Sequence, residues 1–122
     1  MVQSVVHPQE IEVWYILPAI RAELAKAMKE LSLDQKKIAE LLNITEAAVS
    51  QYVSGKRAAD VKFDSSYKEK IKEAAKRIVE SKSHFVKETQ QILSGMWKDK
   101  TICSVHHEQN KDLPKNCNMC WE

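Results

Sequence analysis

The chain has 122 residues, of which 43% are apolar and 30% are charged, and its formal net charge is +2. A chain of this length can form one small domain with an appendage, and its apolar content excludes wholesale disorder. The small net charge permits nucleic-acid binding but does not argue for it. With only 2 Gly and 3 Pro among abundant Ala, Glu, Lys, Leu and Ile, the composition predicts an all-α protein.

Targeting and catalytic signals are not apparent in the sequence. No apolar run approaches the roughly 18 residues that a transmembrane helix needs, and the first residues do not follow the basic-then-apolar pattern of a signal peptide. We therefore expect a cytoplasmic protein without membrane contact. No Gly-rich phosphate loop, carboxylate pair or nucleophile–base set appears, so an enzyme is not expected.

Residues 8–31 are predicted to be helical, because their apolar positions recur with a helical period. These positions are Ile11, Trp14, Tyr15, Leu17, Ile20, Leu24, Ala27, Met28 and Leu31. Pro18 lies inside this pattern. It must either kink one helix or start a second one as its first residue.

Residues 32–57 predict two short helices joined by a tight turn. The stretch S-L-D-Q from Ser32 has the form of a capping box, which predicts a helix from Leu33. Thr45 is a good N-cap for the second helix, and Gly55 is a natural stop. Small Ala39 suits a steep helix crossing. One core can accept Ile38, Leu42, Ile44, Val49 and Tyr52.

The second of these helices, 45–54, then presents a small, polar outward face. Short side chains let a helix lie close in the major groove, and amides and hydroxyls meet base edges. We expect Gln51 to pair with adenine and the basic pair after Gly55 to hold phosphates. The candidate DNA-contacting residues are Gln35, Thr45, Glu46, Ala47, Ser50, Gln51, Ser54, Lys56 and Arg57. The plain alternative is a helical hairpin within an all-helical core.

The stretch 33–57, L-D-Q-K-K-I-A-E-L-L-N-I-T-E-A-A-V-S-Q-Y-V-S-G-K-R, resembles the helix-turn-helix of the phage-repressor (Xre-like) class. Together with I-L-P-A-I-R-A-E-L-A at 16–25, it is similar to a set of short archaeal predicted transcription regulators that tend to carry a C-terminal cysteine motif. The resemblance implies DNA binding as a dimer at a palindromic site. Asn43 stands where the class usually has Gly, and Asn tolerates a left-handed turn. Glu46 stands where Gln is more usual, which leaves the base preference open.

After a linker at 58–64, a second capping box, S-Y-K-E from Ser66, predicts a long helix to about Ser94, with Gly95 as its stop. Its apolar residues repeat every seven positions, at Ile71, Ile78-Val79, Phe85-Val86 and Ile92-Leu93. Such a repeat predicts packing along another helix. We favour a homodimer seam, and docking onto the chain's own core is the alternative.

Residues 96–122 lack a helical period and hold all three cysteines, so an irregular tail is expected there. Its motif C-x2-H-x10-C-x2-C comprises Cys103, His106, Cys117 and Cys120, with His107 able to replace His106. Four such ligands suit tetrahedral Zn²⁺, which would stabilise a tail too small to fold alone. An iron–sulfur cluster acting as a sensor is the competing interpretation, and thiols without a metal are the third.

The sequence therefore predicts three parts: a DNA-binding domain at 1–60, a dimerisation helix at 61–95 and a metal-binding tail at 96–122. The predicted function is a sequence-specific transcription regulator that binds double-stranded DNA through the helix 45–54. The alternatives are a redox or metal-binding protein that works through the tail, and an antitoxin-like interaction protein that uses the tail and the long helix.

Overall fold

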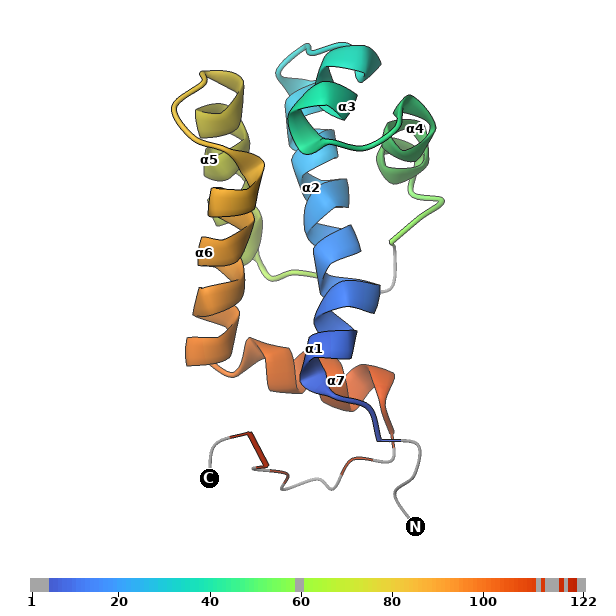
Figure 1. Ribbon diagram of the computed structural model, residues 1–122, viewed down its shortest axis with the longest axis vertical. Coiled ribbons are helices and arrows are strands. Elements are labelled where there is room, and N and C mark those ends of the chain that lie inside the picture. The colour runs from blue at the N-terminus through green and yellow to red at the C-terminus, as the bar shows by residue number, and fades with distance from the viewer. Residues whose placement is uncertain (1–4, 59–60, 112, 114–116, 118, 121–122) are drawn as a thin grey trace.

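The computed structural model describes residues 5–58, 61–111, 113, 117, 119 and 120. Within these residues the protein is all-helical and has no strand (Figure 1), which confirms the predicted fold class. The elements are α1 (Pro8–Ile11), the π-helical turn η1 (Glu12–Ile16), α2 (Leu17–Glu30), α3 (Gln35–Leu42), α4 (Glu46–Ser54), α5 (Ser65–Val79), α6 (Phe85–Lys98) and α7 (Thr101–Gln109).

The first three elements form one continuous rod through the centre of the molecule (Figure 1). Pro18 has no N–H, and its ring would clash with the carbonyl of Trp14 in a regular helix. The wider π-helical turn accommodates this, because the N–H of Leu17 donates to Glu12, five residues back. A new helical register thus starts at Leu17, with Pro18 in its first turn.

The N-cap of two helices is an aspartate and not the predicted serine. Asp34 Oδ1 accepts from Lys37 N at 2.8 Å and starts α3 at Gln35. The predicted start at Leu33 is wrong because Ser32, with φ of 70°, is the left-handed residue that ends α2. Asp64 caps α5 in the same way, so the box predicted from Ser66 is wrong as well.

The predicted single helix from 66 to about 94 is wrong, because the chain reverses between Val79 and Phe85. Ser81, with φ of 61°, ends α5, and the N–H of Lys82 returns to the carbonyl of Arg77 at 2.9 Å. His84 Nδ1 then caps α6 by accepting from Val86 N at 3.2 Å. The two helices therefore lie antiparallel as a hairpin (Figure 1).

Most of the seven-residue stripe packs within the chain, although Val86 is 51% exposed. Helix α5 packs on α2, α6 packs on α5, and α7 contacts both α6 and α1. Ile71 is 1% exposed, Ile78 is 3% exposed, and Ile92 and Leu93 are buried. Docking onto the chain's own core therefore accounts for the repeat that suggested a homodimer seam.

A part-buried ion pair between α5 and α6 closes the hairpin. Arg77 donates twice to the carboxylate of Glu88, at 2.9 Å from Nε and 2.7 Å from Nη2. Glu88 is only 3% exposed. The hydrogen bonds from Arg77 hold the pKa of Glu88 below its ordinary value, although burial acts in the opposite direction.

The tail is more regular than predicted. Gly95 does not end α6, which runs on to Lys98, and α7 follows directly. The buried residues of α7, which are Ile102, Val105 and His106, do follow a helical spacing. The sequence did not show an apolar period here because one of these buried positions is a histidine. None of the helices in the described ranges is long and apolar enough to cross a membrane.

Candidate nucleic-acid interface and cysteine-lined cavity

Helices α3 and α4 meet through a tight left-handed turn. Asn43 has φ of 54° and ψ of 48°, and the N–H of Ile44 donates to the carbonyl of Ala39 at 3.0 Å. Thr45 Oγ1 accepts from Ala48 N at 3.0 Å, so Thr45 is the predicted N-cap of α4. Gly55, with φ of 80°, ends α4. The start, turn and stop of this motif are therefore encoded locally.

The two faces of α4 separate as the sequence indicates. Toward the core, Val49 is 1% and Tyr52 is 2% exposed, and they belong to the same buried core as Ile38 and Leu42 of α3. Ile44 is only partly buried. The solvent-facing residues of α4 are Glu46, Ala47, Ser50, Gln51 and Ser54. The predicted contact face is thus accessible along the length of the helix.

Residues from other elements surround this face. Gln35 Nε2 donates to the carbonyl of Glu46 at 2.7 Å, which joins the start of α3 to the start of α4. Lys29, near the end of α2, shares a shallow hollow of about 190 Å³ with Gln35, Ser50 and Ser54. Sequence reasoning missed Lys29, because only the packing of α2 against α4 brings it there.

The basic pair after α4 lies beside the same face. Lys56 and Arg57 are exposed. The guanidinium of Arg57 stands 5.3 Å from the centroid of the Tyr52 ring, and its Nη1 is 3.4 Å from Gln51 Oε1. A cation therefore lies next to the amide that is predicted to contact a base. Such a cation can meet a phosphate while Gln51 faces the groove.

At the opposite end of the central rod, α7 crosses beneath α1 (Figure 1). A cavity of about 440 Å³ there is lined by residues of α7, of the segment after it and of the N-terminal segment. Its lining includes all three cysteines, together with His7, His106 and His107. The long separation between the two halves of the predicted motif is therefore bridged by the fold.

The three thiols are close enough to influence one another. Burial raises the pKa of the Cys120 thiol above its ordinary value, and Cys103 and Cys117 raise it further. In the described part of the chain, no three His, Cys, Asp or Glu side chains already converge on a point that could hold a metal ion. The thiol and imidazole donors are nevertheless of the chemical type that binds thiophilic metals, and they line one cavity.

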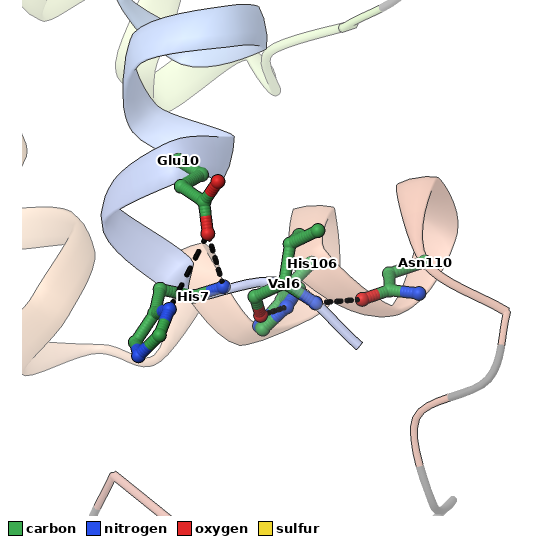
Figure 2. Close-up of polar contacts among 5 residues, drawn as sticks. All are labelled: Val6, His7, Glu10, His106 and Asn110. Carbon is green, nitrogen blue, oxygen red and sulfur yellow. Dashed lines mark hydrogen bonds and ion pairs between the residues drawn. The ribbon is translucent and has the colours of Figure 1, made fainter. Parts of the chain in front are cut away.

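His106 has a structural role at this end of the molecule. It is 6% exposed, and its Nε2 lies 2.8 Å from the carbonyl oxygen of Val6. Asn110 Oδ1 accepts from the N–H of the same residue, also at 2.8 Å (Figure 2). Burial lowers the pKa of His106 below its ordinary value, which favours the neutral ring. The two side chains thus hold both backbone polar groups of Val6.

The neighbouring histidines use different partners. His107 Nδ1 lies 2.8 Å from the carbonyl oxygen of Cys103, one helical turn earlier. His7 opens α1, where its N–H donates to Glu10 at 3.0 Å (Figure 2), and this bond lowers the pKa of Glu10. Sequence reasoning gave no role to His7 or to His84, and both stand at helix starts.

Comparison with known proteins bears on the first of these two sites. Residues 24–63 match the model of a family described as helix-turn-helix. The match spans α3 and α4 and includes every predicted DNA-contacting residue, and it supports the resemblance of this stretch to the phage-repressor class. Neither the curated proteins nor the solved structures gave a match. The chain therefore carries a helix-turn-helix domain of the kind found in DNA-binding transcription regulators, a kind that is generally not enzymatic.

Proposed function

We propose that this protein is a sequence-specific transcription regulator that reads double-stranded DNA with the exposed face of α4. The observation that carries this proposal is the division of α4 into an apolar buried face and a short, polar, exposed one. Ala47 and Ser50 allow close approach to the groove floor. Gln51 offers the amide that pairs with adenine, and Ser50 offers a hydroxyl that can donate or accept.

Phosphate contacts would position this helix on the duplex. Lys56 and Arg57 follow α4, Gln35 opens α3, and Lys29 borders the same hollow. Contacts of this type set register and not sequence, and they make the affinity fall as salt rises.

We further propose that two copies bind a palindrome, with their α4 helices in successive major grooves about 34 Å apart. The support is the shortness of α4, since nine residues can reach only a few base pairs. The apolar stripe of α5 and α6 is used inside the chain. We therefore propose that the two copies come together when they bind the two halves of the operator, and not through α5 and α6.

The test is the double variant Ser50→Ala with Gln51→Ala. An operator is first selected from random duplexes, and binding is then measured by fluorescence anisotropy at several salt concentrations. Each base contact is worth about 1–3 kcal/mol, so specific affinity should fall at least about 30-fold. Salt-dependent binding to unrelated DNA should remain. The matched control, Gln90→Ala with Ser94→Ala on the exposed face of α6, should bind normally. Unchanged specific binding by the α4 variant would exclude this groove assignment.

We also propose that the C-terminal tail binds a metal, with Zn²⁺ favoured and an iron–sulfur cluster as the alternative. The support is the set of three cysteines and two histidines of the tail on one cavity. Metal analysis and an absorption spectrum of protein purified without oxygen distinguish the two. A colourless protein with zinc makes the tail a structural staple. A brown protein with iron makes it a sensor, and its DNA affinity should then change in air.

A further inference from the structure

We propose that His107, and not His106, is the nitrogen ligand of this metal site, together with Cys103, Cys117 and Cys120. The inference rests on the proposed metal-binding function of the tail. It changes the ligand spacing on α7 from C-x2-H to C-x3-H. It also gives the two adjacent histidines separate tasks, one toward the metal and one toward the N-terminal segment.

His106 is committed to the protein. Its Nε2 lies 2.8 Å from the Val6 carbonyl, and it also hydrogen-bonds the side chain of Asn110. To bind a metal through Nε2, the ring would have to release Val6, and the carbonyl at this part-buried contact would lose its partner. To bind one through Nδ1, the ring would have to leave its buried position. Because the ring is 6% exposed and joins positions 100 residues apart, it behaves as a clamp on the segment that leads into α1.

The ring of His107 is held by a backbone carbonyl in the way that metal-bound imidazoles commonly are. A carbonyl oxygen only accepts, so the contact with Cys103 puts the ring proton of His107 on Nδ1. Nε2 then carries the lone pair that a metal ion takes. Metal-bound histidines commonly donate the other ring N–H to a backbone carbonyl in this way, which fixes both tautomer and ring orientation.

The spacing on α7 agrees with this assignment. Cys103 and His107 are four residues apart in one helix, so their side chains lie on the same face. This is also the separation at which two helical residues commonly grip a single zinc ion. Both residues line the cavity of about 440 Å³ that Cys117 and Cys120 also line.

The site would be completed by the metal itself. The donors share the cavity but have not converged among the described residues, so binding must draw Cys117 and Cys120 toward α7. Coupling of this kind between metal binding and local folding is typical of small cysteine-rich sites. Leu113, which is buried, lines the same cavity and would help to shield the bound ion from water.

The experiment compares single variants of the full chain, prepared without metal and titrated with Zn²⁺ and with Co²⁺ as a spectroscopic probe. His107→Ala should weaken Zn²⁺ binding by at least about 100-fold, since even the loss of a residue that only hydrogen-bonds a metal ligand weakens metal affinity about 10–100-fold. It should leave the melting temperature of the metal-free protein almost unchanged. His107→Cys should restore tight binding, with stronger thiolate-to-cobalt absorption.

His106→Ala should behave in the opposite way, with a lower melting temperature of the metal-free protein and near-normal Zn²⁺ affinity. If that variant does not fold, His106→Gln keeps a donor toward Val6 and reports the same affinity. His7→Ala is the matched control from the same cavity. Loss of Zn²⁺ binding in the His106 variants with retention in His107→Ala would overturn the assignment. A wild-type protein that binds neither Zn²⁺, Co²⁺ nor an iron–sulfur cluster would instead refute the metal-binding tail as a whole.

Discussion

Single residues decide where this chain changes direction. Five described non-glycine residues have left-handed backbone, and the four in short connections between helices are Ser32, Asn43, Ser81 and Lys100. The fifth, Ala58, lies in the longer segment between α4 and α5. Each of the four lies between two helices and lets the chain turn within a few residues. Asn43 is the one on which the proposed DNA interface depends, since it sets the angle between α3 and α4.

We predict that Asn43→Ala lowers the free energy of unfolding by about 1 kcal/mol, because a left-handed conformation costs an ordinary L-residue about 1–2 kcal/mol. Asn43→Gly should stay within about 0.5 kcal/mol of the wild type, since relief of backbone strain is offset by the greater freedom of the unfolded chain. Urea unfolding measures both, with Gln90→Ala as the control on an exposed helix. Equal stability of the Ala and Gly variants would contradict the role given to this turn.

The Arg77–Glu88 pair predicts an asymmetry. Arg77→Met leaves a carboxylate buried without its partner and should cost about 3 kcal/mol. Glu88→Met should cost less, because the Arg77 side chain is 44% exposed and can turn to water.

Since the folded state lowers the pKa of Glu88, this pair stabilises the fold above the ordinary glutamate pKa of 4.5, and that stability is lost as the pH falls through the lower folded value. Chemical unfolding across this pH range should show that the free energy of unfolding falls less on acidification in Glu88→Met than in the wild type.

At the scale of elements, capping side chains in the polar connecting segments determine where the helices begin. Asp34, Thr45, Asp64 and His84 each accept from a backbone N–H at the beginning of a helix. The predicted boxes at Ser32 and Ser66 were displaced by aspartates two residues away. Ser32 instead adopts the left-handed conformation that ends α2. Asp64 caps α5 so that the helix begins at Ser65, before the predicted start.

The cap of α5 offers a direct check. Asp64→Ala should lower the free energy of unfolding by about 1 kcal/mol, as is typical when an N-cap is lost. Ser66→Ala should leave it nearly unchanged, because Ser66 is exposed and lies inside the first turn. Thermal or urea unfolding of the two variants distinguishes them. A larger effect at Ser66 would restore the capping box that the sequence suggested.

At the scale of the whole molecule, one central rod connects the two candidate sites. The helix-turn-helix lies at one end and the cysteine-lined cavity at the other, where α7 holds the start of the rod through Val6 (Figure 1). The hairpin α5–α6 packs along the rod and closes the core. The stability of the domain should therefore depend on this hairpin in each single copy.

We predict that Ile71→Ala lowers the melting temperature by the same amount at every protein concentration. Ile71 is 1% exposed, and truncating such a buried residue costs about 2–5 kcal/mol. If α5 formed the seam of an obligate dimer, the melting temperature would rise with protein concentration. Scanning calorimetry over a wide concentration range separates the two cases, and a concentration-dependent shift would return the stripe to a dimer interface.

The sequence by itself determined the all-α class and the helix-turn-helix. The signals for α3, the turn and α4 lie within about one helical turn of the residues they act on: Thr45 caps, Asn43 turns, Gly55 stops, and the apolar spacing separates buried from exposed residues. Hydrophobic period and capping are local properties, so they can be read without knowledge of the fold.

Only the tertiary structure decided what depends on distant parts of the chain. The seven-residue repeat predicts that a helix packs along another, and it cannot tell a partner copy from the chain's own α2. Likewise, the motif spacing makes His106 and His107 equivalent, and only contact with Val6, 100 residues away, distinguishes them. Lys29 lies beside the proposed DNA-binding face of α4 for the same reason. Contacts between remote segments depend on the packing of the whole core, so a local sequence pattern does not specify them.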